Sequence, residues 1–301
     1  MRVARSPAEL GAAERAVAVG TFDGVHRGHR RVLDLVVGAS RDGRRVPTVV
    51  TFDPHPRVAL GHRVDLIAPL ERRLELLAAA GIEESLVIDF TPDVAALEPE
   101  VFARDVLHRL GARVVVAGDG FRFGRNRRGD LALLASLGFE VLVAPLEPGV
   151  SSTAIRRVVA AGNVVEAARL LGRPVEVEGV VVAGDARGGT LGYPTANLSV
   201  APDLLVPAYG IYAGAAAGHR AAVSIGLNPH YGGVERRIEA FLLDFAGDLY
   251  GQRIVVELWA RLRDERAFAS EAELVEQIGR DVAATRAAEP PLSGATARED
   301  A

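Results

Sequence analysis

The chain has 301 residues, of which 49% are apolar and 25% are charged, so it can fill the cores of about two domains. This composition excludes a disordered or collagen-like polymer. The net charge of −4 excludes the general positive field of a protein that coats nucleic acid. The chain has neither Cys nor Lys, which excludes thiolate nucleophiles, disulfides, Cys-ligated metals, Lys-dependent phosphate loops and Schiff-base chemistry.

The sequence predicts neither a secretory signal nor a membrane span. Residues 1–20 lack a long apolar stretch before a small-residue cleavage site, and no later stretch approaches the roughly 18 apolar residues of a membrane span. We therefore expect a soluble cytoplasmic protein that binds neither nucleic acid nor membranes.

Short β-branched runs alternate with helical patterns in the first half of the chain, which predicts a Rossmann-like parallel sheet with crossover helices. Such sheets bind their ligands at the carboxyl ends of the strands. The predicted strands are Ala16–Phe22, Val46–Phe52, Ser85–Phe90, Arg113–Ala117 and Phe139–Ala144, and the predicted helices are Arg27–Ala39, Leu70–Ala80, Pro99–Leu110 and Asp130–Leu137.

The pattern changes after Gly172. Residues Arg253–Arg263 alternate with a period of two, with Ile254, Val256, Leu258, Ala260 and Leu262 on the apolar side and Trp259 on the polar side. Similar segments separated by glycine-rich or polar breaks predict an antiparallel β-barrel or sandwich. These segments are Val175–Ala183, Gly210–Ala216, Ala221–Ile225 and Arg236–Phe245.

A closing helix is predicted over Ser270–Arg286, where Ser270 and Glu273 form a capping box. From Glu289 the composition is typical of a disordered tail. The expected domains are therefore residues 1–172 and 173–288, followed by the tail 289–301.

The first candidate site follows the first predicted strand and leads directly into a helix, whose N-terminus favours phosphate. His26 and His29 are three residues apart, so they would share one face of the helix and could donate hydrogen bonds to a phosphoryl oxygen. The alternative is a glycine turn with two solvated histidines. The other residues of this candidate nucleotide site are Gly20, Phe22, Asp23, Gly24 and Gly28.

Two further loops follow predicted strands. His55 lies between two prolines, and this fixed backbone suits contact with a nucleotide or a flavin. Residues 118–129 combine arginines with aromatic side chains, which indicates a lid that supplies Arg to a phosphate and an aromatic ring to a flat ligand. An incidental His and a solvated arginine loop are the alternatives. The candidate flavin-binding residues are His55, Phe121, Arg122 and Phe123.

Residues 150–157 follow the fifth predicted strand and begin another helix. Ser and Thr at this position are first of all N-caps. Their hydroxyls could also hold a triphosphate together with the helix amides and an Arg one turn further on. Ser152, Thr153 and Arg156 are therefore candidate phosphate ligands.

These four motifs, in this order, resemble the nucleotidyltransferase domain of the prokaryotic bifunctional riboflavin kinase/FMN adenylyltransferase family, the FAD synthetases. Residues 184–198 are similar to the kinase module's glycine-rich turn and its Pro-Thr-Ala-Asn signature, and residues 239–251 to its acidic strand and following turn. The resemblance covers roughly residues 16–286. It implies that the second half phosphorylates riboflavin to FMN and that the first adenylates FMN to FAD, with Mg²⁺ carried by ATP and apo-flavoproteins as recipients of the product.

Phosphoryl transfer from ATP to a primary alcohol needs a phosphate cradle, Mg²⁺ and a base near the hydroxyl. The resemblance gives the role of base to Glu239. Thr195 and Asn197 alternate along an extended segment, so they would offer two neutral oxygens to a metal already held by ATP. The candidate phosphate-cradling residues of the turn are Gly184, Arg187 and Gly192.

Three positions depart from the family's usual pattern. Gly120 replaces a residue that is often acidic or an amide, Gly189 replaces an Arg, and Leu227 begins a variant of a Thr-Asn-Pro-Thr-Phe segment. The change at Gly120 removes a possible hydrogen bond to the flavin. Two alternatives therefore stand beside the bifunctional enzyme: a riboflavin kinase with a weakened N-terminal domain, and a regulator that binds flavin or nucleotide without turnover.

Overall fold

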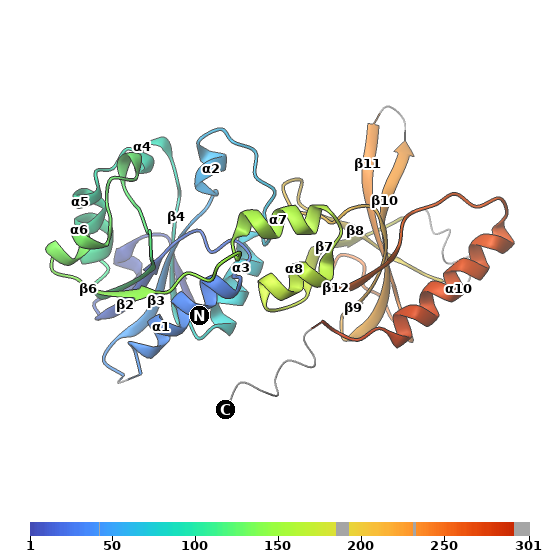
Figure 1. The fold of residues 1–301 in the computed structure, drawn as a ribbon, viewed down its shortest axis with the longest axis horizontal. Helices are drawn as coiled ribbons and strands as arrows, with labels where there is room; N and C mark the ends of the chain where they lie inside the picture. The colour runs from blue at the N-terminus through green and yellow to red at the C-terminus, as the bar shows by residue number, and fades with distance from the viewer. Residues whose placement is uncertain (42, 185–192, 231–232, 292–301) are drawn as a thin grey trace. The chain divides into compact units, whose positions relative to one another are not determined.

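The computed structural model describes residues 1–41, 43–184, 193–230 and 233–291. Its contacts divide the chain into two compact units, Met1–Ser151 and Ser152–Ala301, which Figure 1 colours from blue to green and from green to red. The predicted range 1–172 includes the two helices that follow Ser151, whereas contacts group them with the second unit. The domain ranges themselves stay a prediction.

The first unit is built on a six-stranded parallel sheet with the strand order β1-β4-β3-β2-β5-β6, which confirms the predicted Rossmann-like fold. Its strands are β1 (Arg2–Ala4), β2 (Arg15–Val19), β3 (Val46–Phe52), β4 (Glu84–Ile88), β5 (Ala112–Gly118) and β6 (Glu140–Ala144). Its α-helices are α1 (Arg27–Gly38), α2 (Pro56–Ala59), α3 (Leu70–Ala79), α4 (Pro92–Ala95), α5 (Pro99–Phe102) and α6 (Leu131–Ser136). The turns η1 (Pro7–Leu10) and η3 (Arg125–Arg127) are 3₁₀-helical, and η2 (Ala103–His108) continues α5 as a π-helix.

Helices cover both faces of this sheet, so its central strands carry mainly apolar side chains on both faces. Val17 and Val19 of β2 belong to a core shared with α5, η2 and α6. Ala16 and Ala18 belong to the opposite core, with α1 and α3. Because helices cover the two faces, a ligand can reach the sheet at the carboxyl ends of the strands, where the loops lie.

The second unit contains a closed antiparallel barrel with the strand order β10-β11-β8-β7-β12-β9, which confirms the predicted barrel. Its strands are β7 (Val175–Val182), β8 (Ala196–Ser199), β9 (Gly210–Ala216), β10 (His219–His230), β11 (Gly233–Leu242) and β12 (Arg253–Arg263). Strand β12 corrects one expectation. The register shifts between Leu258 and Ala260, so Leu258 and Trp259 are both buried and the strict alternation ends there.

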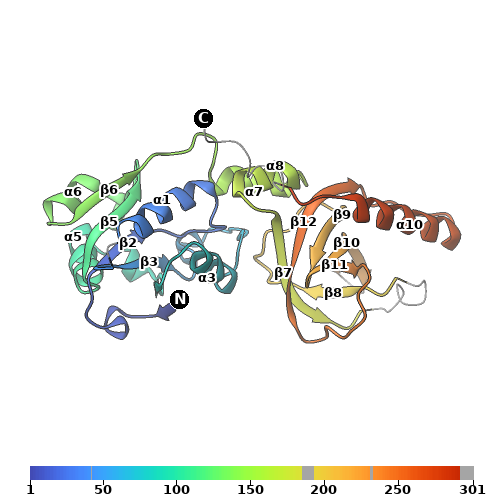
Figure 2. The ribbon, with the colours of Figure 1, turned by 90° about the horizontal axis from the view of Figure 1, so that it is seen from below.

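Three described helices accompany the barrel: α7 (Ser152–Ala160), α8 (Val164–Leu171) and α10 (Glu271–Ala287). Helix α8 contacts β7 and β12, and α10 contacts β9 and β10 (Figure 2). Ser270 caps α10 by accepting a hydrogen bond from the amide of Glu273, which confirms the predicted N-cap. The Glu273 carboxylate accepts from the amide of Ala269 rather than from that of Ser270, so the second bond of a capping box is displaced by one residue. The predicted tail lies mainly in residues 292–301, outside the described residues.

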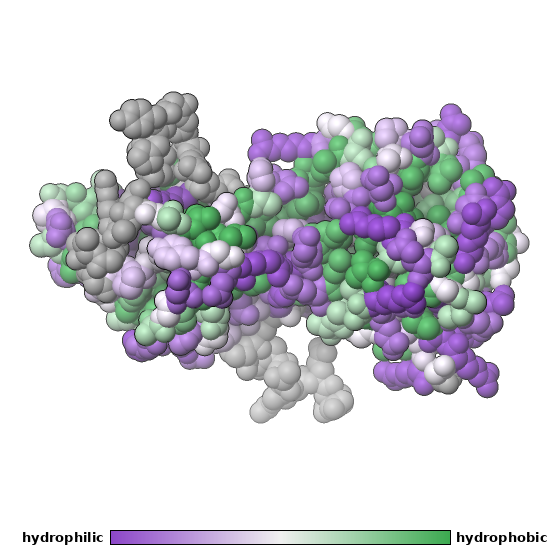
Figure 3. Space-filling view, turned by 180° about the vertical axis from the view of Figure 1, so that it is seen from behind, coloured by the Kyte–Doolittle hydropathy of each residue, from purple (hydrophilic) through white to green (hydrophobic). Residues whose placement is uncertain are grey.

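Exposed hydrophobic residues are interspersed with hydrophilic ones on the face drawn in Figure 3. Within the described ranges, no helix combines the length and the apolar composition needed to cross a bilayer.

Candidate functional site

The first candidate site lies at the carboxyl end of β2, where α1 begins. His26 is the N-cap of α1, and its ring Nδ1 accepts a hydrogen bond from the amide of His29 at 3.3 Å. The two imidazole rings stack, with centroids 3.6 Å apart and an interplanar angle of 16°, as their spacing predicts. The edge of Phe22 supports His29 at a centroid distance of 5.2 Å. The two histidines therefore form one stacked pair whose rings are held by the surrounding residues.

The hydrogen bond to Nδ1 fixes what His26 can do. A neutral imidazole whose Nδ1 accepts a hydrogen bond carries its proton on Nε2. His26 is buried, so both its ring position and its tautomer are set by the protein. A ring held in this way can donate through Nε2 to an oxyanion at the helix N-terminus without reorganising.

The surrounding candidates mainly shape this loop. Asp23 is fully buried, and its Oδ1 accepts hydrogen bonds from the amides of Ile67 and Ala68 at 2.9 and 3.1 Å. At Gly24, with φ at +81°, a Cβ would lie 2.6 Å from Ile67, so glycine is needed for this contact. Phe22 and Val25 also have positive φ, at 48° and 40°. Conformations of this kind persist only where the surroundings impose them.

The glycines at both ends of the motif lie against aromatic rings of the same loop. A Cβ on Gly20 would lie 3.1 Å from the ring of Phe22, and one on Gly28 would lie 3.3 Å from the ring of His26. Small residues at these positions therefore let the two rings pack closely on the backbone. Phosphate contacts of Gly20, Phe22, Asp23, Gly24 and Gly28 stay a prediction.

A residue that the sequence analysis missed joins the first two strand ends. Arg73 of α3 is 3% exposed and donates to the carbonyl oxygens of Thr21 at 2.9 Å and Phe52 at 3.1 Å. Burial lowers the pKa of Arg73, while the charges of Asp23 and Asp53 oppose this shift. An arginine within an amphipathic helical pattern looks like a solvated residue in the sequence, so no signal marked this one.

His55 follows β3 and caps the short helix α2, with its Nδ1 accepting a hydrogen bond from the amide of Arg57 at 3.2 Å. Two aromatic rings lie near the ends of the neighbouring strands: Phe52 and Phe90 meet edge to face at 5.3 Å. His55 is partly exposed, so a ligand can reach its side chain. Its contact with a flavin or nucleotide stays a prediction.

Three candidate flavin-binding residues lie in the loop after β5, one in the core and two nearer the surface. Phe123 is buried and packs on Phe102 at 5.9 Å, so it anchors the loop. Phe121 stacks on Phe123 at 5.7 Å and is partly exposed, which makes it the ring available to a flat ligand. Arg122 is exposed and donates to the carbonyl of Phe121 at 2.9 Å.

Ser152, Thr153 and Arg156 lie in the first two turns of α7, within the second unit. Their predicted contact with the triphosphate stays a prediction.

The second candidate site is on the barrel. Glu239 of β11 is directly opposite Asn197 of β8 in the antiparallel register, so their side chains share a face of the sheet, with Cβ atoms about 5 Å apart. Arg237 forms an ion pair with Glu239 at 3.4 Å and is a further residue that the sequence analysis missed. A Cβ on Gly184 would lie 2.2 Å from the amide of Asn197, so glycine is required for Asn197 to occupy its position.

A cavity of about 280 Å³ lies next to the Pro-Thr-Ala-Asn segment, and Asn197 and Glu239 are not among the residues that line it. Thr195, immediately before β8, lines this cavity, and the turn after β11 closes it with Phe245, Asp248 and Tyr250. The cavity thus brings together the Pro-Thr-Ala-Asn segment and the acidic turn, two motifs far apart in the sequence. Arg187 and Gly192, the other candidate phosphate ligands, lie outside the described residues, as does Gly189.

Both halves of the chain match models of known families. Residues 10–152 match the FAD synthetase model, and residues 171–288 match the riboflavin kinase model. A bifunctional riboflavin kinase/FMN adenylyltransferase from Listeria monocytogenes is 35% identical, over 91% of this chain and 92% of that protein. The corresponding Escherichia coli protein is 37% identical, over 88% of this chain and 90% of its own.

The relationship also holds in three dimensions. A crystal structure described as a macrolide-efflux protein from Streptococcus pneumoniae aligns with a TM-score of 0.84 and 33% identity. The alignment covers 94% of this chain and 98% of that one. Both units therefore occur together, in the same order, in that solved structure.

Proposed function

The chain belongs to the bifunctional riboflavin kinase/FMN adenylyltransferase family, and from this premise we propose which residues carry each of its two reactions. It is an ATP-dependent transferase that phosphorylates riboflavin to FMN and adenylates FMN to FAD, with release of pyrophosphate. The observation that carries the division of labour is that the His26–His29 pair and the Asn197–Glu239 pair lie in different compact units.

In the kinase reaction, Glu239 accepts the proton of the riboflavin primary hydroxyl as that oxygen attacks the γ-phosphorus of ATP. The ion pair with Arg237 holds the carboxylate on the face that Asn197 shares. A carboxylate held in this way can serve as a general base without first being ordered.

The residues around Asn197 fit the Mg²⁺ that accompanies ATP. The hydroxyl of Thr195 and the amide oxygen of Asn197 are neutral oxygen donors, a type that suits Mg²⁺ already bound to phosphates. Because Gly184 has no side chain, the amide group of Asn197 can lie against its backbone. When bound, Mg²⁺ neutralises charge on the phosphates. Thr195 and Asn197 would hold it, and Gly184, Arg187 and Gly192 would cradle the phosphates beside it.

In adenylyl transfer, a phosphate oxygen of FMN attacks the α-phosphorus of ATP, and pyrophosphate leaves. His26 and His29 donate hydrogen bonds to the α-phosphoryl oxygens as negative charge accumulates there. Ser152, Thr153 and Arg156 bind the departing phosphates, and His55, Phe121 and Arg122 contact the flavin, with Phe123 anchoring their loop. The enzyme forms no covalent intermediate in this scheme.

Two reciprocal variants test these roles. Glu239→Gln keeps the shape of the side chain and removes the base, so FMN formation should fall about 10²-fold or more while FAD formation from supplied FMN is unchanged. His29→Ala should lower adenylyl transfer on the order of 10²-fold, in kcat more than in the KM for ATP, and spare the kinase. The measurement is separation of FMN from FAD after incubation with riboflavin or FMN, ATP and Mg²⁺. Loss of both activities in either variant would contradict the two-site scheme.

We also propose which proteins receive the FAD that this enzyme makes. Flavoproteins bind FAD, so apo-flavoproteins are the proposed recipients. The proposed compartment of the enzyme is the cytoplasm.

A further inference from the structure

Arg73 bridges the two strand ends that carry candidate adenylyl-transfer residues. The last ladder bond between β2 and β3 runs from the amide of Gly20 to the carbonyl of Val50 at 3.0 Å. Beyond it, the carbonyls of Thr21 and Phe52 are satisfied by the guanidinium of Arg73. One side chain therefore continues the connection between the strands after their own hydrogen bonds have stopped.

The segment that carries Arg73 also holds the first loop at a second point. The amides of Ile67 and Ala68 bind the buried carboxylate of Asp23, three residues before His26. Thr51 adds a hydrogen bond to the Thr21 carbonyl at 3.2 Å. The loop before the histidine pair is thus fixed from α3 and from β3.

The second loop is held by the same guanidinium. Besides its bond to Phe52, Arg73 lies 4.0 Å from the carboxylate of Asp53, two residues before His55. Placing a cation in the interior is unfavourable unless hydrogen bonds and opposite charges compensate. Arg73 has both, and they come from two different loops.

We propose that Arg73 is a positioning residue for adenylyl transfer, which holds the His26–His29 loop and the His55 loop in a fixed relation. The inference rests on the proposed function of those histidines. Each loop would still bind its own substrate without Arg73, so the KM values for ATP and FMN should change little. Mutual alignment of the substrates would be lost, and a misplacement of about 1 Å can cost on the order of 10²-fold in rate.

The test compares Arg73 with another buried arginine of the same unit. Arg15 is fully buried at the amino end of β2, where it pairs with Glu84 at 2.7 Å and donates to the carbonyls of Leu110 and Leu10. It lies at the end of the strand opposite to the site. Arg15→Met and Arg73→Met each remove a buried cation, but only Arg73→Met should affect the chemistry.

In the full-length protein, kcat for FAD formation from FMN is divided by the folded fraction of the first unit, taken from its unfolding transition. Arg73→Met should lower this kcat roughly 10- to 100-fold, with both KM values within about three-fold of wild type. Arg15→Met should keep the wild-type kcat. FMN formation at the barrel should be unchanged in both variants.

Equal kcat values for the two variants would overturn the proposal, because Arg73 would then act through stability alone. If Arg73→Met does not fold, Arg73→Gln replaces it, since one amide group can reach one carbonyl but not both. A wild-type kcat for folded Arg73→Gln would also overturn the proposal. His29→Ala tests the role of the histidines separately from the role of Arg73. If this variant keeps wild-type adenylyl transfer, the function proposed for the histidines is wrong, whatever the result for Arg73.

Discussion

Gly120 is the residue at which the sequence analysis expects a lost flavin contact, and its backbone conformation favours glycine. Its φ is +81°, a conformation that favours glycine, and Asn and Asp tolerate it better than other residues. No other atom lies within 4 Å of the position that a Cβ would take. The site therefore has room for a side chain, and the obstacle to one is conformational.

We expect Gly120→Asn to lower the KM for FMN in adenylyl transfer about five-fold. This corresponds to one hydrogen bond worth about 1 kcal/mol, reduced by any cost of the left-handed backbone. Gly120→Ala is the matched control, because it adds the strain of a Cβ without a polar group, and it should not lower the KM. An unchanged or higher KM in a folded Asn variant would identify Gly120 as a backbone requirement rather than a lost contact.

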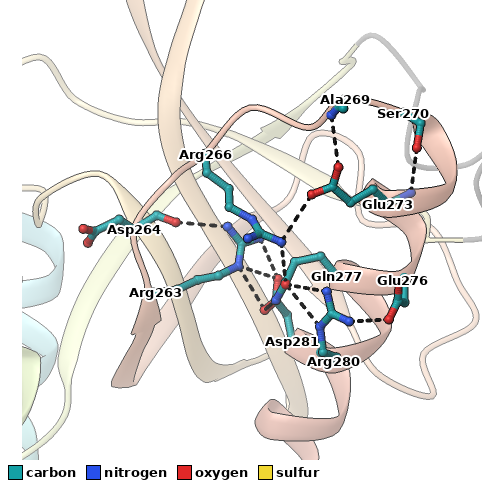
Figure 4. Close-up of polar contacts among 10 residues, drawn as sticks. All are labelled: Arg263, Asp264, Arg266, Ala269, Ser270, Glu273, Glu276, Gln277, Arg280 and Asp281. Atoms are coloured by element: carbon teal, nitrogen blue, oxygen red, sulfur yellow. Dashed lines mark hydrogen bonds and ion pairs between the residues drawn. The ribbon is translucent and has the colours of Figure 1, made fainter.

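Helix α10 is the element in which buried and exposed ion pairs can be compared directly. Asp281 is buried and accepts hydrogen bonds from Arg263 of β12 at 2.7 Å and from Gln277 at 2.8 Å (Figure 4). Arg280 pairs with Glu276 on the same helix, and both side chains are more than half exposed. The first pair ties the helix to the barrel, whereas the second stays within one helix.

Asp281→Ala should destabilise the second unit by about 2 kcal/mol, because it leaves Arg263 largely buried without its counter-charge. This value is below that of a fully buried pair, since one-fifth of the Arg263 side chain is exposed. Arg280→Ala should change stability by no more than about 0.5 kcal/mol. Urea unfolding followed by the fluorescence of Trp259, the single Trp of the chain, measures both. Equal effects would mean that Asp281 is not a structural anchor.

Three predicted strands have the bounds that the structure shows: β3, β9 and β12. The strict alternation expected for β12 nevertheless ends at Leu258. Strands β1 and β8 were missed because three or four residues are too few to show a period. Strand β11 ends at Leu242, before the predicted Phe245, because Asp244 turns the chain with φ at +57°. Local pattern therefore sets the centre of an element, while tertiary contacts and turns set its ends.

Sequence motifs indicated the strand ends of the site but not the residues that join them. The stacking of His26 and His29 joins the N-cap of α1 to the first turn of the helix, three residues further on. Arg73 bonds to Thr21, which lies 52 residues away in the sequence, so the contact depends on how α3 packs across two strands. Arg237 and Glu239 are two residues apart on β11, so the alternation of a strand already places them on one face, and the sequence analysis missed this local signal. Long-range partners such as Arg73 and Thr21 have no local signal.

At the scale of the whole molecule, the boundary of the kinase unit determines which fragment can stand alone. Helix α8 buries one face, and it contacts β7 and β12 of the barrel. Gly162, just before α8, lies close to the hydroxyl of Tyr212, with a Cβ position 3.0 Å from it. The sequence places the start of the kinase domain at residue 173, after these helices, whereas the contacts include them from Ser152 onward.

We therefore expect a fragment of residues 152–301 to be more stable than a fragment of residues 173–301, by on the order of 5 kcal/mol. The shorter fragment loses the apolar side chains that α8 buries, each worth about 1–2 kcal/mol, and exposes their partners on β7 and β12. Those side chains are Val164, Ala167, Ala168, Leu170 and Leu171.

Urea unfolding of both fragments gives the difference in stability, and FMN formation from riboflavin shows whether each fragment retains kinase activity. The longer fragment should match the full chain in kinase kcat, because Glu239, Asn197 and Thr195 all lie within it. If the shorter fragment were equally stable and equally active, α7 and α8 would be a connector, and the kinase would begin at the barrel itself.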